Sequence, residues 1–210
     1  TTGGVVNLVS TPIPEDPSGR LQFVYGQDSQ ADMLVSYGGQ VGSFGFSLET
    51  AQRSGDGFKS IDRSHGDAGY EIADYVAKLS WQGTDHALRL KAQYSDEESD
   101  ETYLGLTDVD FAQTADRRYG LSAPDRMSNE HKGVSVAWEW QLASDAALTT
   151  TVYRNEFHRD WFKLSGGGKL ISAANQGDLD AQAVLDGEQD SSGLSYKHNN
   201  RRYISEGLQT

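Results

Sequence analysis

The stretch that decides the fold class is Val134-Ser-Val-Ala-Trp-Glu-Trp-Gln-Leu142. An apolar or aromatic side chain occupies every second position, and serine, alanine, glutamate and glutamine stand between them. Successive side chains of a β-strand point to opposite faces of the sheet. The stretch therefore predicts a strand with one apolar face and one polar face.

A second stretch, His86-Ala-Leu-Arg-Leu-Lys-Ala-Gln-Tyr94, repeats this alternation. Leu88 and Leu90 share one side, whereas Arg89 and Lys91 share the other. The same pattern fits a soluble sandwich with its apolar face inward and a membrane barrel with its apolar face toward lipid. The connections favour the barrel, because short turns and long polar loops alternate along the chain.

Composition excludes several classes of protein. The chain has 210 residues, 36% hydrophobic content, 23 glycines and no cysteine. No apolar run approaches the roughly 18 residues of a spanning helix, and without cysteine there is no disulfide framework or thiolate metal site. The formal charge of −13 argues against nucleic acid as a partner, because nucleic acid requires a basic surface.

The pattern along the chain predicts about eight strands. Residues 4–10 read as a short strand, and three of the four prolines follow in a connector at 11–19. Further strands are expected at about 20–28, 31–40, 43–52, 70–82 and 86–96, through Trp138, from Ala146 toward Phe157, and from Asn200 onward. The two longest loops are expected to extend to about Lys132 and from Asp160 to His198. In the second, Asp178 can cap a short helix that Gly187 ends.

Eight acidic residues fall within one of these loops: Asp96, Glu97, Glu98, Asp100, Glu101, Asp108, Asp110 and Asp116. The ordinary interpretation is a solvated loop. The alternative is a loop that binds divalent cations or lies close to lipopolysaccharide and its bridging ions, since oxygen ligands suit calcium.

Enzyme chemistry is not indicated. No two of the five histidines have the i, i+4 spacing of a helical zinc site. Ser165-Gly-Gly-Gly-Lys169 resembles a phosphate-binding loop only in part, because Lys163 stands where the first glycine belongs, and we interpret the stretch as a flexible loop. We expect no catalytic residues, no metal ligands and no cofactor.

Three further stretches resemble one protein family. Gly3-Gly-Val-Val-Asn-Leu-Val9 resembles the end of the plug domain of TonB-dependent outer-membrane receptors. Asp100-Glu-Thr-Tyr-Leu-Gly-Leu-Thr-Asp108 with Arg117-Arg-Tyr119 resembles an extracellular loop of the receptors grouped as ferric dicitrate transporters, a subgroup that includes siderophore receptors. Leu185-Asp-Gly-Glu and Asn199-Asn-Arg-Arg-Tyr-Ile-Ser-Glu-Gly207 resemble later parts of the same proteins.

The resemblance implies an all-β fold: an antiparallel transmembrane β-barrel segment of about eight strands from a larger plugged barrel, with short periplasmic turns and long extracellular loops. Residues 1–10 would end the plug, 11–18 would form a proline-rich linker, and 19–210 would begin the barrel. The implied location is the bacterial outer membrane, with lipid and lipopolysaccharide as neighbours. The implied partners are an iron chelate, ferric citrate or a siderophore, and TonB, which would bind a segment absent from this chain.

Two sets of residues follow as candidate sites. The apolar sides of the two clear strands should face lipid: Leu88, Leu90, Val134, Val136, Trp138 and Trp140. An anionic chelate requires positive groups, and arginine can hold a carboxylate with two parallel hydrogen bonds. The candidates are Arg117, Arg118, Arg126 and Arg159, although pairing with neighbouring acids is an equally reasonable role for them.

Two alternative functions stay open from the residues alone. One is a small closed eight-stranded outer-membrane barrel with a structural or adhesion role. The other is a secreted β-sandwich that binds carbohydrate.

Overall fold

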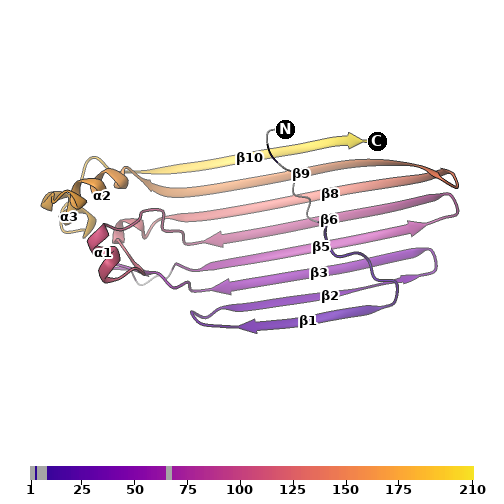
Figure 1. The fold of residues 1–210 in the computed structure, drawn as a ribbon, viewed down its shortest axis with the longest axis horizontal. Helices are drawn as coiled ribbons and strands as arrows, with labels where there is room; N and C mark the ends of the chain where they lie inside the picture. The colour runs from indigo at the N-terminus through magenta and orange to yellow at the C-terminus, as the bar shows by residue number, and fades with distance from the viewer. Residues whose placement is uncertain (1–2, 4–8, 65–67) are drawn as a thin grey trace.

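The chain forms one large antiparallel sheet with a cluster of loops at one end (Figure 1). The computed structural model describes residues 3, 9–64 and 68–210. The sheet contains eight strands: β1 (Ser18–Tyr25), β2 (Ala31–Val41), β3 (Phe44–Gly55), β5 (Tyr70–Gln82), β6 (His86–Ser99), β8 (Arg126–Ala143), β9 (Ala146–Ser165) and β10 (Ser195–Gln209).

Strands that follow one another in the chain lie side by side in this sheet. At one end they are joined by the short turns 42–43, 83–85 and 144–145, and Gly42 has the positive φ of +58° that tight hairpin turns favour. The long connections all lie at the opposite end (Figure 1). The architecture confirms the expected all-β fold class and the expected asymmetry between turns and loops.

The strand register gives the sheet two chemically different faces. Leu90 of β6 lies opposite Val136 of β8, and Leu88 lies opposite Trp138. We call this side the apolar face. Lys91 lies opposite Ser135 on the other side, which we call the polar face. Because the side-chain period of a strand is two residues, pairing in register keeps the side chains of each side together across neighbouring strands. On β9 and β10 the side of the apolar face also carries ion pairs, Arg154 with Glu206 and Arg202 with Glu156.

A second structural unit, the loop cluster, lies at the long-loop end. It contains the parallel pair β4 (Ser60–Ile61) and β7 (Arg117–Arg118), the helices α1 (Asp108–Gln113), α2 (Gly167–Asn175) and α3 (Leu179–Leu185), and the 3-10 turn η1 (Gly120–Ser122). Its core is formed by Leu104, Tyr119, Leu164 and Leu185, all of which are buried. No helix in the described part of the chain is long and apolar enough to cross a bilayer.

Several sequence-based boundaries were wrong. The acidic stretch is not one loop, because β6 extends to Ser99 and β8 begins already at Arg126. β9 likewise continues to Ser165, beyond the expected loop start. The stretch interpreted as a flexible loop at residues 165–169 instead contains the end of β9 at Ser165 and the beginning of α2 at Gly167, and Leu170 and Ile171 of α2 pack on the core of the loop cluster.

The short helix predicted after Asp178 is confirmed. The Asp178 side chain accepts hydrogen bonds from the backbone N–H groups of Asp180 and Ala181, both at 3.0 Å, and so caps α3. Gly187 follows the helix with a φ of +70°. The local sequence is sufficient here, because a cap and a left-handed glycine act within one helical turn.

Most of the expected plug end (residues 1–10) and of the strand expected at 4–10 lies outside the described residues, because residues 1–2 and 4–8 are not described. The proline-rich residues 11–17 form no strand and cross the polar face of the sheet (Figure 1). Lys78 donates a hydrogen bond to the carbonyl of Thr11. A Cβ atom on Gly45 would meet Ile13 at 3.1 Å, so the glycine permits close approach of this segment.

Candidate functional site

Arg117 is the centre of the loop cluster. Its Nε donates to both carboxylate oxygens of Asp62 at 3.2 and 3.0 Å. Nη1 donates to Asp110 at 2.7 Å, and Nη2 donates to Asp186 at 2.7 Å. These hydrogen bonds, those to Asp62 above all, raise the pKa of Arg117 against the opposing effect of burial. One guanidinium therefore joins three segments of the chain.

Asp110 links this ion cluster to the apolar core. Its carboxylate accepts hydrogen bonds from Tyr119 Oη at 2.6 Å and from Thr107 Oγ1 at 2.9 Å. Burial alone would raise the pKa of Asp110, but these bonds together with Gln182 and Arg117 lower it below its ordinary value. Tyr119 is fully buried, and this burial with its bond to Asp110 raises the pKa of its phenol.

Asp125 ties the start of β8 to two neighbouring segments. Only 1% of the residue is exposed, and its carboxylate accepts backbone N–H groups from Tyr103 at 3.0 Å and Leu164 at 2.7 Å. Burial raises the pKa of Asp125, although both hydrogen bonds act in the opposite direction. The loops over the sheet therefore form an ordered cap with its own core and polar network.

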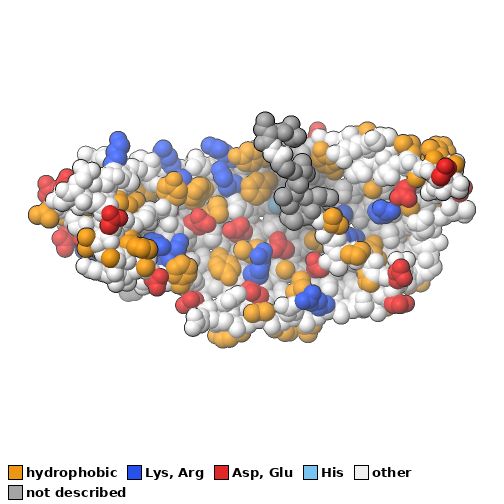
Figure 2. Space-filling view, viewed as in Figure 1, with side chains coloured by type: hydrophobic (Ala, Val, Ile, Leu, Met, Phe, Trp, Pro, Cys, Tyr) orange, Lys and Arg blue, Asp and Glu red, His pale blue; other side chains and the backbone are white. Residues whose placement is uncertain are grey.

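The polar face carries charges of both signs, which Figure 2 shows across the middle of the sheet. Arg89 and Glu139 form an ion pair at 3.0 Å between β6 and β8. A cavity of about 230 Å³ lies between residues 10–14 and this face, next to Lys78. The expectation that Arg89, Lys91 and Glu139 share one side of the sheet is confirmed by the register.

Cations and aromatic rings gather on the polar face where β9 approaches the loop cluster. The Lys163 ammonium lies 3.6 Å from the centre of the Tyr103 ring and 3.7 Å from that of Trp161. The Arg159 guanidinium lies 5.8 Å from the Trp161 ring centre. Such contacts stabilise a cation without neutralising its charge.

The apolar face has aromatic side chains near the turn end. Trp138 and Trp140 stack with ring centres 6.1 Å apart, and His86 lies 5.8 Å from each. From Trp140 to Lys132 the face extends eight residues, or about 26 Å at the usual rise of a strand. There the Lys132 ammonium lies 5.7 Å from the ring of Tyr94. An apolar band therefore ends in amphipathic residues on both sides.

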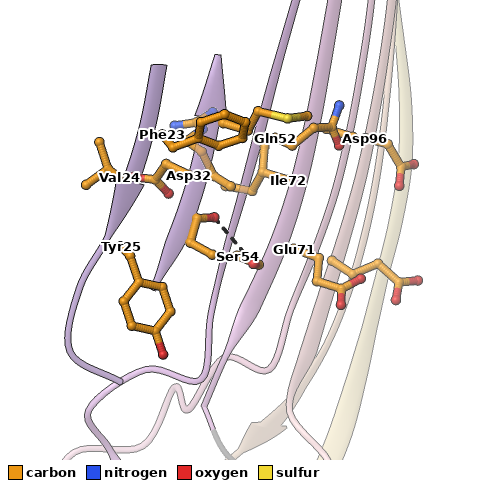
Figure 3. Close-up of a pocket in the computed structure, with 14 residues that line it drawn as sticks. Phe23, Val24, Tyr25, Asp32, Gln52, Ser54, Glu71, Ile72 and Asp96 are labelled. Carbon is orange, nitrogen blue, oxygen red and sulfur yellow. Dashed lines mark hydrogen bonds between the residues drawn. The ribbon is translucent and has the colours of Figure 1, made fainter. Parts of the chain in front are cut away.

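A hollow of about 730 Å³ lies on the side of the apolar face, near the long-loop end of the sheet (Figure 3). It spans β1 to β6, and its lining includes Phe23 and Tyr25 on one side and Glu71 and Asp96 on the other. Because it lies on the opposite side of the sheet from residues 11–17, this hollow is separate from the polar face.

The four arginines proposed as ligand-binding residues do not form one site. Arg117 is held by three carboxylates, and Arg118 donates to the carbonyl oxygens of Ala115 at 2.8 Å and of Arg117 at 2.6 Å. Arg126 pairs with Glu98 on the side of the apolar face. Arg159 lies on the polar face. Their role in ligand binding stays a prediction.

The acidic stretch is divided among a strand, a helix and loop segments, and the loop segments contain Asp100, Glu101 and Asp116. Asp96, Glu97 and Glu98 belong to β6, whereas Asp108 and Asp110 belong to α1. Within residues 9–64 and 68–210, no group of three or more His, Asp or Glu side chains converges as metal ligands.

Sequence reasoning missed the cations and aromatic side chains around Trp161. The signal was present in the sequence, because aromatic and cationic residues occupy every second position of one continuous strand and therefore share a face: Phe157, Arg159, Trp161 and Lys163. The sequence analysis ended this strand near Phe157, and the pattern beyond that residue was therefore missed. Tyr103 could not have been added from sequence, since it reaches Trp161 only through the packing of its loop.

Neither a family model nor a curated protein matches this sequence. Among solved structures, the siderophore receptor PiuA from Acinetobacter baumannii is similar, with a TM-score of 0.64 and 12% identity over 80% of this chain and 25% of that one. BauA, the ferric preacinetobactin receptor from the same bacterium, has a TM-score of 0.57 and 16% identity over 73% of this chain and 23% of its own.

The chain spans about a quarter of the length of these two receptors. At such low identity the likeness establishes the fold. The eight-stranded antiparallel sheet is therefore a barrel-like segment of the kind that these receptors contain.

Proposed function

We propose that this chain forms part of the barrel wall of a TonB-dependent outer-membrane receptor that takes up an iron chelate. The observation that carries the proposal is the division of one eight-stranded sheet into an apolar face and a polar face, with residues 11–17 crossing the polar face and ordered loops at one end. A barrel wall between lipid and a plugged lumen requires this arrangement.

Sheet topology favours a large barrel over the two alternative functions. In the described residues β1 pairs only with β2 and β10 only with β9, so the sheet does not close on itself as a small barrel would. The eight strands form a single sheet, whereas a β-sandwich packs two sheets against each other. Both unpaired edges can be covered by further strands of a larger barrel.

The apolar face is the side that would contact lipid. On β6 and β8 its exposed residues include Leu88, Leu90, Val134, Val136, Trp138 and Trp140. Aromatic side chains at the borders of an apolar band are typical of outer-membrane barrels. The loop cluster would then lie outside the cell and the short turns in the periplasm.

The similar structures support an iron chelate as the ligand, because PiuA is named as a siderophore receptor and BauA as a ferric preacinetobactin receptor. Ferric citrate is the alternative chelate within the same proposal. Arg118 and Arg159 are better placed to meet an anionic chelate than Arg117, because three protein carboxylates already hold the Arg117 guanidinium.

Uptake in cells tests the proposal. The full-length protein that carries this sequence is expressed in a Gram-negative strain that lacks its own iron-chelate receptors, and transport of radiolabelled iron chelates is measured with and without TonB. We expect the protein in the outer-membrane fraction and uptake only with TonB. Correct insertion with no uptake of any ferric citrate or siderophore tested would contradict the proposed activity, and a soluble protein would contradict the barrel.

A further inference from the structure

We propose that β9 and β10 carry an anion-binding subsite on the polar face, which binds the carboxylates of the transported chelate. The subsite consists of Arg159, Lys163, Lys197 and Arg201, which we call the cation group. This inference rests on the proposed function and narrows the ligand to a polyanionic carboxylate chelate.

The first argument is the pairing of like charges. Arg159 of β9 lies directly opposite Arg201 of β10, and Lys163 lies directly opposite Lys197. Cross-strand partners have Cβ atoms only about 5 Å apart, and like charges in this position destabilise a sheet. The chain has a net charge of −13, yet two such pairs lie between β9 and β10. An anion bound between them would offset the repulsion of the like charges.

The other side of β9 and β10, which is the side of the apolar face, provides the comparison. There Arg154 pairs with Glu206 at 2.8 Å, and Arg202 pairs with Glu156. Among the ion pairs of the described residues, none joins a member of the cation group to a carboxylate. Asp125 acts on Lys163 electrostatically, but its two oxygens already accept backbone N–H groups. The positive charge is therefore neutralised on one face and not on the other.

Unpaired donors at the same place give the second argument. Arg159 Nε and Trp161 Nε1 are buried atoms without a hydrogen-bond partner in the described structure. Buried donors without partners cost free energy, and an acceptor supplied by a ligand would remove that cost. Trp161 and Tyr103 also flank Lys163, and their low polarity strengthens any charge interaction beside them.

The chemistry of these groups selects a carboxylate. Two guanidinium groups can each hold a carboxylate through parallel hydrogen bonds, and the two ammonium groups add positive charge beside them. The cation group lies at the end of β9 and β10 next to the loop cluster, on the face away from lipid in the proposed barrel (Figure 1). A chelate that passes the loops would meet it before reaching the middle of the polar face.

A matched pair of double variants tests the subsite in the purified full-length receptor. Arg159→Gln with Arg201→Gln removes charge from the cation group, whereas Arg154→Gln with Arg202→Gln removes the same charge from the same strands on the opposite face. Binding of ferric citrate and of a neutral ferric trihydroxamate is measured by titration calorimetry. We expect the first variant to bind ferric citrate about tenfold more weakly, as the loss of a charge-assisted hydrogen bond implies. The control variant and the neutral chelate should show no comparable change.

The outcomes separate this inference from the proposed function. If the wild-type receptor binds the neutral chelate but not ferric citrate, the subsite would be overturned and the proposed receptor function would stand. Binding of neither would overturn both. If the Arg159→Gln/Arg201→Gln variant keeps its ferric citrate affinity but is cleaved faster by protease inside the barrel, the subsite would be overturned. The cation group would then bind an acidic segment of the protein instead. If the Arg159→Gln/Arg201→Gln variant does not assemble, the single change Lys197→Gln, at an exposed residue, should still weaken ferric citrate binding. Unchanged affinity in the Lys197→Gln variant would overturn the subsite.

Discussion

Arg117 and Asp186 are 69 residues apart in the chain, yet their side chains meet at 2.7 Å. The same guanidinium also holds Asp62 and Asp110. These contacts join three long loops that would otherwise be independent connections between strands. The loop cluster is therefore expected to be ordered before any ligand arrives, which reduces the entropy lost on binding.

Removing Arg117 should loosen the loop cluster and leave the sheet intact. In Arg117→Ala, three carboxylates face one another without a cation. A broken buried ion pair costs about 3–5 kcal/mol, and we expect about 1–3 kcal/mol here because the group is partly exposed. Hydrogen exchange should accelerate at residues 100–125 and 165–194. Arg118→Ala is the control, since its side chain donates to backbone carbonyls, and equal acceleration in both variants would contradict this role for Arg117.

The loop cluster should also lose stability in strong acid. The folded-state pKa of Asp110 lies below its ordinary value of 3.8. The contribution of Asp110 is therefore complete above pH 3.8 and is lost as the pH falls through its lower folded-state pKa. Protection of the loop cluster against hydrogen exchange should decline below pH 3.8. An Asp110→Asn variant should be less protected at neutral pH and show a weaker acid dependence.

A charge introduced into the apolar face should impair membrane insertion. Val136→Arg should cost about 2–4 kcal/mol near the middle of the bilayer. Reversible folding of the full-length receptor into lipid vesicles measures this free energy. Ser135→Arg is the matched control, because the neighbouring side chain points to the polar face. Equal effects of both changes would mean that the faces are wrongly assigned.

The 210-residue chain by itself should associate in detergent-free buffer. Within the part of the chain that the structure describes, β1 and β10 each have one edge without a strand partner, and large apolar side chains such as Phe23 and Leu208 are about two-thirds exposed. Open edges and exposed apolar surface promote pairing between chains. Sedimentation velocity should therefore show oligomers or aggregates. A monodisperse monomer with a cooperative thermal transition would contradict the barrel-wall proposal.

The fold class could be predicted because it depends on local pattern. The alternation through Trp138 identifies a strand, its two faces and its neighbours in a hairpin, since all of these act within a few residues. The helix after Asp178 was predictable for the same reason. In contrast, α2 has no local signal of comparable strength and forms where Leu170 and Ile171 pack on the core of the loop cluster.

The candidate site depended on contacts between distant residues. Sequence identified Arg117 as a candidate but not its three carboxylate partners, which come from separate loops. It also gave no indication that Arg159 faces Arg201, because this pairing is set by the register between β9 and β10.

By itself, the sequence determined that the chain forms strands with one apolar and one polar face, because side-chain alternation is a property of each strand alone. Only the tertiary structure decided which charges are neutralised and which are not. Register places Arg154 against Glu206 and Arg159 against Arg201, and the difference between an ion pair and an anion site depends on that placement.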